Sequence, residues 1–288
     1  MPAPSLRSWV GGYTGYREDT DSPMSWVETP SGAAVLVLGC GEPLTVSECT
    51  GTRSDRPHTG STVDSFAGGL CDRPTLVTHG GSQEGVQVRL DPLALYALFG
   101  VPLNELTGQR GGVVDLAELG AREWGERLGA QTDWGARFAL LDQLLASQIA
   151  ASSTALSPEV LTAWEGLRVN GGNVPIAQLV AASGLSHRTF ISRFRQHVGV
   201  TPKVAARIVR YEQAISLLGT NAHSLAGVAA ESGYADQAHL NREFARLAGY
   251  SPSALLAGRQ GLGDYQRIGS IPTAESSSTA KSISSKTS

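Results

Sequence analysis

The sequence predicts an α+β protein with a β-rich N-terminal domain, a helical connector and an all-α C-terminal domain that contains two helix-turn-helix units. Three observations predict this class. Residues 31–92 read as short extended runs between turn residues, apolar residues take helical spacing after Pro92, and two similar helical segments follow Ile176. The expected domains are 1–120, β-rich; 121–160, the connector; 161–260, all-α; and 261–288, a disordered tail.

Size and composition favour a soluble protein of about two domains. The chain has 288 residues, of which 41% are hydrophobic and 17% charged. Cys40, Cys49 and Cys71 are widely spaced without a C-x-x-C pair, which gives no support for a zinc knuckle or a redox dithiol. The N-terminus lacks the pattern of a signal peptide, and no apolar run is long enough to span a bilayer. We therefore expect a cytoplasmic protein with reduced thiols and no membrane partner.

Charge is distributed unevenly along the chain. Residues 1–165 carry 10 Lys+Arg and 20 Asp+Glu, residues 166–258 carry 9 and 4, and residues 259–288 carry 4 and 2, which together give the net charge of -3. The three parts thus have net charges of -10, +5 and +2. A basic module joined to an acidic one is typical of a nucleic-acid binder with a separate sensing or assembly domain.

The N-terminal runs predict a small sandwich or barrel followed by helices. The candidate strands are "AAVLVLGC", "LTVSECT", "TLVTHG" and "GVQVRLDP". After Pro92, "LALYALFG" and the segment 123–150 have helical spacing, and we expect a helical hairpin to connect the two halves. A new helix is expected to begin at Ser157, with Pro158 at its first position. The Ser/Thr-rich end of the chain has little to bury.

A repeat organises the C-terminal part. The segment from Ile176 to Pro202 is echoed by the segment from Leu225 to Pro252. Each copy has a first helix, a glycine at a sharp turn (Gly184 or Gly233), a second helix, and a closing Gly-x-x-Pro. The turn glycine is expected to adopt positive φ. The inward residues of the second helices are expected to be Phe190 and Phe194 in one copy, and Leu240 and Phe244 in the other.

At these residues the chain resembles the AraC/XylS family of bacterial transcription regulators. "GLSHRTFISRFRQHVGVTP" resembles the first recognition segment of that family, "ARIVRYEQAISLL" its linker helix, and "GYADQAHLNREFARLAGYSP" its second helix-turn-helix signature. The resemblance covers Leu167 to Leu256 and is specific because the three pieces occur in order. It implies a sequence-specific DNA-binding transcription factor that lays two recognition helices into successive major grooves of double-stranded DNA, about 10 bp apart.

The resemblance also assigns residues that read bases. In the first helix the family's positions fall on Arg188, Ile191 and Ser192; in the second they fall on Gln237, Ala238, Asn241 and Arg242. Arginine pairs with guanine, glutamine and asparagine pair with adenine, and alanine can touch a thymine methyl group. Ile191 and Ser192 depart from the longer polar side chains common at those positions, so specificity in the first helix rests on Arg188.

Contacts with the DNA backbone are expected to supply most of the affinity. We assign this role to the start of the first recognition helix and to nearby cations: Ser186, His187, Arg193, Arg195, Lys203 and Arg207. For Arg193 and Arg195, a solvated surface position is an equal alternative. Asp236 is expected to cap the second recognition helix rather than to contact DNA.

The N-terminal half carries no catalytic signature. Relatives commonly have a cupin-like domain here that binds a small effector or mediates dimer contacts, and residues 31–92 are compatible with it. His58, His79 and Glu84 lack the spacing of a cupin metal site, and neither a phosphate loop nor a nucleophile elbow occurs. Trp9, Tyr13, Tyr16 and Trp26 could line an apolar pocket, although core positions are the simpler interpretation. We expect no enzyme activity, metal or other cofactor.

Two other functions stay open at this point. One is a cupin-like small-molecule binding protein or enzyme with an accessory helical domain, and the other is an architectural DNA binder of low specificity. The resemblance adds RNA polymerase as an expected partner. The sequence does not decide whether the chain forms a homodimer, which effector it binds, or whether it activates or represses transcription.

Overall fold

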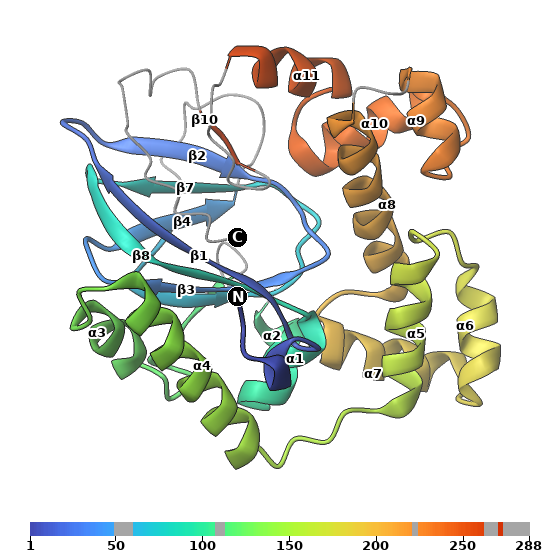
Figure 1. The fold of residues 1–288 in the computed structure, drawn as a ribbon. Helices are drawn as coiled ribbons and strands as arrows, with labels where there is room; N and C mark the ends of the chain where they lie inside the picture. The colour runs from blue at the N-terminus through green and yellow to red at the C-terminus, as the bar shows by residue number, and fades with distance from the viewer. Residues whose placement is uncertain (49–59, 107–112, 221–223, 262–269, 273–288) are drawn as a thin grey trace.

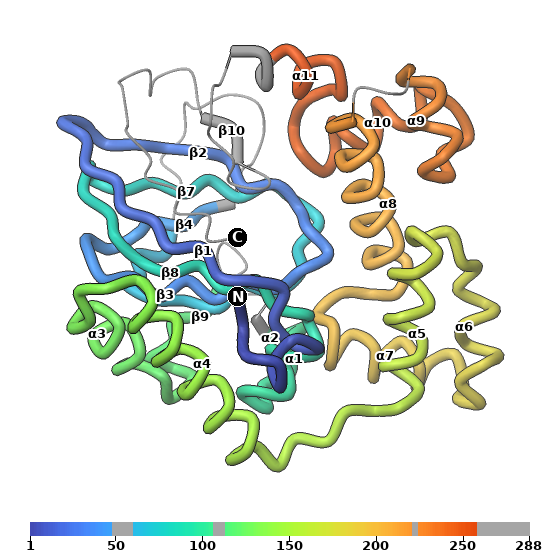
Figure 2. The backbone as a smooth tube through the Cα atoms, in the orientation of Figure 1, coloured from blue at the N-terminus to red at the C-terminus, as the bar shows by residue number. Residues whose placement is uncertain are grey.

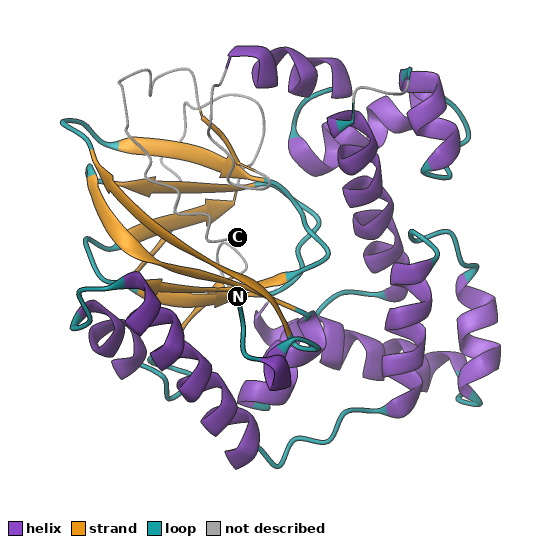
Figure 3. Ribbon diagram, in the orientation of Figure 1, coloured by secondary structure: helices purple, strands orange, loops and turns teal. Residues whose placement is uncertain are grey.

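The computed structural model describes residues 1–48, 60–106, 113–220, 224–261 and 270–272. Within these ranges the strands form one layered unit and the later helices a second unit beside it (Figures 1 and 3). The N-terminal unit, called here the sheet domain, consists of the chain up to the end of α4 (Trp134–Ala151) together with β10 (Ser270–Pro272). The C-terminal unit, called the helical domain, begins at α5 (Pro158–Val169).

Two antiparallel sheets form the sheet domain, as the short alternating runs predict. In the described part of the chain the first has the order β1-β8-β3-β6-β9 and the second the order β10-β2-β7-β4-β5. The strands of the first sheet are β1 (Val10–Asp19), β8 (Ser82–Leu90), β3 (Ala34–Gly39), β6 (Ser65–Gly68) and β9 (Val113–Asp115). Those of the second are β10 (Ser270–Pro272), β2 (Met24–Glu28), β7 (Thr75–His79), β4 (Leu44–Glu48) and β5 (Ser61–Val63).

Helices cover the outer face of the first sheet. They are η1 (Pro4–Leu6), α1 (Pro92–Phe99), α2 (Leu103–Leu106), α3 (Glu123–Gly129) and α4. Leu36, Val88 and Leu141 belong to one buried core with Trp124. The predicted hairpin at 121–160 therefore exists, but α3 and α4 complete the core of the sheet domain, and the link between the domains is the short segment 152–157. This moves the boundary beyond the expected residue 120.

The tail differs from expectation at three residues. Strand β10 pairs antiparallel with β2, placing Ile271 opposite Val27. An edge strand offers unpaired backbone groups to any extended segment of the chain, which explains why so polar a tail can add a strand. The prediction of disorder from residue 261 is wrong at Ser270–Pro272, and the other tail residues after Gly261 lie outside the described ranges.

The helical domain has the predicted tandem order. Its elements after α5 are α6 (Ile176–Ser183), α7 (His187–Val198), α8 (Pro202–Gly219), α9 (Leu225–Glu231), α10 (Gln237–Ala248) and α11 (Pro252–Gly261). Figure 2 shows α8 running between the helices of the first repeat, α6 and α7, and those of the second repeat, α9 and α10. Pro158, Pro202 and Pro252 each stand at the start of a helix, where a missing N–H is tolerated.

The two domains are in contact through α1 and the loops around it. Trp164 Nε1 of α5 donates a hydrogen bond to Asp91 Oδ2 over 3.0 Å, and Asp91 also caps α1. Leu70 and Leu93 of the sheet domain are buried in the same core as Trp164 and Phe190. The sheet domain therefore supplies part of the hydrophobic core around the first helix-turn-helix unit.

His197 lies in this domain contact, at the end of α7. Its ring centroid is 4.3 Å from that of Tyr96 on α1, its Nε2 accepts from the Ser157 backbone N–H over 3.3 Å, and its Nδ1 lies 2.8 Å from the Arg193 carbonyl oxygen. Burial lowers the pKa of His197 below its usual 6.5. The folded protein thus favours the neutral imidazole.

The His197 pKa predicts acid-sensitive stability. A depressed histidine pKa contributes stability that is complete above the unfolded value of 6.5 and is lost as the pH falls from there through the folded pKa. Between about pH 7.5 and 5.5, wild-type protein should therefore lose more unfolding free energy than the His197→Gln variant. Urea unfolding at both pH values measures this, with exposed His187→Gln as the control on the same helix. Equal losses in the wild type and His197→Gln would contradict the assignment.

Candidate nucleic-acid interface

Two helical pairs, α6 with α7 and α9 with α10, have the geometry expected of helix-turn-helix units. Gly184 has φ of 66° and Gly233 has φ of 74°, so both turn glycines occupy the left-handed region as predicted. The second helix of each pair begins with a side-chain cap. Ser186 Oγ accepts from Thr189 N over 3.2 Å, and Asp236 Oδ1 accepts from His239 N over 2.6 Å.

The inward faces of α7 and α10 are anchored as the spacing predicts. Phe190, Phe194, Leu240 and Phe244 are each 0% exposed. Full burial of one such side chain is worth about 1.5–3 kcal/mol. These anchors fix the rotation of each helix, and the polar residues near its N-terminus therefore lie on the surface.

The outer face of α7 is basic. Arg188, Ser192 and Arg195 are exposed, whereas Ile191 is half-buried and packs on the edge of the first core. Arg188 and Ser192 are one turn apart and lie opposite Phe190 and Phe194 on the helix. Of the three positions predicted to read bases in this helix, Arg188 and Ser192 are presented to the surface, and Ile191 is partly engaged in packing.

The outer face of α10 presents Gln237, Ala238 and Arg242, which are all exposed. Asn241 is half-buried, and its Oδ1 is buried without a hydrogen-bond donor among the described residues. An amide in this position lacks the freedom to present both of its polar atoms to an adenine edge. Arg242 and Gln237 are therefore the exposed hydrogen-bonding side chains among the residues predicted to read bases in this unit.

Comparison with known families supports the tandem assignment. Residues 179–258 match the family described as "Helix-turn-helix domain". Residues 179–258 therefore form a helix-turn-helix domain.

Individual relatives match parts of the chain. An uncharacterised HTH-type transcriptional regulator of Haemophilus influenzae is 35% identical over 78 residues, which is 27% of this chain and 26% of that relative. The chain therefore covers about a quarter of that relative's length. ToxT from Vibrio cholerae aligns over 85% of this chain and 97% of its own, with 11% identity and a TM-score of 0.47. The DNA-binding domain of AdpA, a global transcriptional factor in complex with a target DNA, aligns over 36% and 96%, with 29% identity and a TM-score of 0.34.

The residues predicted to contact the DNA backbone have different surroundings in the helical domain. His187, Arg195 and Lys203 are exposed, and Ser186 serves as a helix cap. Arg193 lies 3.8 Å from Glu159 Oε2. The Ser157 hydroxyl, the Glu159 backbone N–H and Arg193 all contribute to lowering the pKa of Glu159, with Ser157 contributing most. That these residues contact the DNA backbone stays a prediction for Ser186, His187, Arg193, Arg195 and Lys203.

Arg207 is not on the surface. Its side chain is 12% exposed, and its Nε donates to Glu243 Oε2 over 2.9 Å. Its Nη2 lies 3.7 Å from Asp72 Oδ2 of the sheet domain. Arg246 on α10 lies 3.5 Å from the same Asp72 oxygen. Sequence reasoning missed Arg246, although its position one turn after Arg242 was a usable signal.

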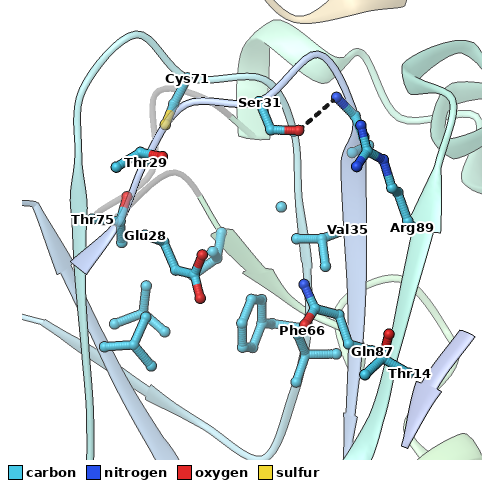
Figure 4. A pocket seen from close by; sticks show the side chains of 18 of the residues that line it. Thr14, Glu28, Thr29, Ser31, Val35, Phe66, Cys71, Thr75, Gln87 and Arg89 are labelled. Carbon is cyan, nitrogen blue, oxygen red and sulfur yellow. Dashed lines mark hydrogen bonds between the residues drawn. The ribbon is translucent and has the colours of Figure 1, made fainter. Parts of the chain in front are cut away.

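A second candidate site is a cavity of about 370 Å³ between the two sheets. Figure 4 shows polar side chains from both sheets around it, with Phe66 and Val35 among the apolar lining. Glu28 accepts a hydrogen bond from Trp26 Nε1 over 2.7 Å, and Arg89 is ion-paired with Glu212 of α8. Of the four aromatic residues noted in the sequence, Trp9 is packed at the core edge, while Tyr13, Tyr16 and Trp26 line the cavity.

His79 lies outside the cavity lining and pairs with a carboxylate. Its Nε2 is 3.3 Å from Glu18 Oε2, and both side chains are buried. Within the described residues there is no group of three or more His, Cys, Asp or Glu side chains that could hold a metal ion, and no helix is long and apolar enough to cross a membrane. His58 and Cys49 lie outside the described ranges.

The side-chain cap of α10 gives a prediction about the stability of the protein that can be tested without DNA. Asp236→Ala removes the carboxylate that accepts from His239 N and should lower the unfolding free energy by about 1 kcal/mol. Urea unfolding followed by circular dichroism measures the loss. Ser192→Ala, at an exposed position that caps no helix, is the control and should stay within about 0.5 kcal/mol of wild type. A stability unchanged by Asp236→Ala would argue against a capping role.

Proposed function

We propose that the chain is a sequence-specific DNA-binding transcription regulator whose sheet domain binds a small effector. The observation that carries this proposal is the tandem AraC-type domain, in which α7 and α10 are anchored by equivalent buried residues and present exposed polar faces. Arg188 and Arg242 are the main readers of guanine, with Gln237 as a reader of adenine. His187, Arg195 and Lys203 contact phosphates, and Ser186 orients the N-terminus of α7 toward the backbone.

The effector site is the cavity between the sheets. A volume of about 370 Å³ suits a small organic molecule, and the mixed lining offers apolar walls together with the polar groups of Thr14, Gln87 and Arg89. An effector regulates DNA binding only when it binds the DNA-competent and incompetent states with different affinity. RNA polymerase is the expected partner during transcription, and any homodimer would add a second tandem unit at the site.

The test is selection of DNA from a random pool, followed by fluorescence anisotropy of the full chain on the selected duplex. Arg188→Ala and Arg242→Ala should each lose about 1–3 kcal/mol and relax base preference at positions about one helical turn apart. Asn241→Ala should lose less, because its Oδ1 is buried. Arg7→Ala, at an exposed arginine of the sheet domain, controls for loss of one positive charge.

Two other results would redirect the assignment. Binding without an enriched motif, weakened uniformly by each arginine variant, would indicate an architectural DNA binder. No DNA binding at all would refute the regulator and leave the sheet domain as the functional unit.

A further inference from the structure

Four charged side chains meet where the sheet domain contacts the second helix-turn-helix unit. Asp72 belongs to the loop between β6 and β7, Arg207 to α8, and Glu243 and Arg246 to α10. One Asp72 oxygen, Oδ2, lies 3.5 Å from Arg246 Nη2 and 3.7 Å from Arg207 Nη2. The sheet domain therefore places one carboxylate against two arginines of the DNA-binding domain.

The two arginines are incompletely satisfied by this carboxylate. Both distances exceed the 2.7–3.2 Å of a good N–H···O hydrogen bond. Arg207 Nη2 is buried and has no hydrogen-bond acceptor among the described residues. Glu243 binds Arg207 through Nε and not through Nη2. The Nη2 groups that point at Asp72 thus retain donor capacity for a second anion.

Charge balance also depends on Asp72. The cluster contains two carboxylates and two guanidinium groups, and Glu243 holds Arg207 within the helical domain. Withdrawal of Asp72 leaves the cluster with one excess positive charge. Arg246 is 56% exposed and stands one turn beyond Arg242, so it continues the exposed basic face of α10 toward the end of the helix.

We propose that Arg207 and Arg246 form a phosphate-binding site of the second unit, and that Asp72 occupies this site while the two domains are docked. The proposal rests on the function proposed above. A DNA phosphate has the charge and the oxygen acceptors to replace Asp72 between the two guanidinium groups, and arginine binds phosphate through paired N–H donors. DNA contact at this site and docking of the Asp72 loop exclude each other.

The same loop connects the phosphate site to the cavity. Gly69, Cys71 and Thr75 line the cavity on either side of Asp72, so an occupant of the cavity contacts the direct neighbour of the blocking residue. Arg89, also in the lining, is paired with Glu212 on α8. An effector in the cavity therefore acts on DNA binding by holding or releasing the Asp72 loop.

The experiment compares Asp72→Asn with wild type in the full chain without effector, by anisotropy on the selected duplex. The isosteric amide removes the charge and keeps the loop. Because ion pairs near the surface are worth a few tenths to 1 kcal/mol each, release of two pairs should tighten DNA binding roughly 3- to 30-fold. Binding should also depend more steeply on salt, since additional phosphate contacts form. Asp64→Asn, at another exposed carboxyl of the sheet domain, controls for net charge.

Arg246→Ala tests the other half of the site. In the Asp72→Asn background it should abolish the gain in affinity, whereas in the wild-type background, where Asp72 already holds Arg246, it should change affinity much less. Unchanged or weaker binding by Asp72→Asn, or an equal gain from Asp64→Asn, would overturn the inference while the regulator function stands. A wild-type chain that selects no DNA would overturn the proposed function and this inference with it.

Discussion

Helix α8 is buried in two hydrophobic cores at once, and the arrangement of the whole helical domain depends on this. Ile208 and Val209 belong to the core of the first helix-turn-helix unit, and Tyr211, Ala214 and Leu218 belong to that of the second. At 1.5 Å per residue, a helix of 18 residues spans about 27 Å. Neither unit can rotate about α8 without unpacking its own core. The packing of the two cores on α8 therefore fixes the positions of α7 and α10 relative to one another, and no ligand is needed for this.

Electrostatics set the second level of organisation. The acidic sheet domain and the basic helical domain attract one another, and ion pairs such as Arg89 with Glu212 and Asp72 with Arg246 join opposite charges across the contact. Such exposed pairs are individually weak and are screened by salt. Leu70 and Leu93, buried in the first core, supply the stronger hydrophobic attachment. The first unit therefore shares buried packing with the sheet domain, and the pairs of Asp72 with Arg207 and Arg246 are weaker contacts that a competing anion can replace.

Local signals explain how much of the fold the sequence predicts. The turn glycines, Pro158 at a helix start and the apolar spacing of α7 and α10 are determined within a few residues, and they appear as expected. Strand β1 escaped notice because its cavity-facing positions include Gly12, Thr14 and Tyr16, which break the apolar alternation of a typical strand. The packing of α4 on the first sheet could not be predicted either, since an amphipathic helix does not specify its partner.

The candidate interface shows the same division between local and distant information. Helical phase correctly placed Arg188, Ser192, Gln237 and Arg242 at the surface, because the buried aromatic and leucine anchors fix the rotation of each helix. The surroundings of Arg207 were not accessible to this reasoning. One of its partners is Asp72, a residue of another domain, and the periodicity of α8 does not predict a contact with a distant loop.

The two recognition helices are not interchangeable. Both have 12 residues and begin directly after a capping side chain, so Arg188 corresponds to Ala238, and Ser192 corresponds to Arg242. Arg188 stands in the first turn of α7, whereas Arg242 stands one turn later in α10. In the proposed complex with DNA, a guanidinium at these two positions would meet base edges at different points along the groove. Because α8 holds the helices in fixed register, two units with the same backbone present different chemical surfaces, and a target that fits both has two dissimilar halves.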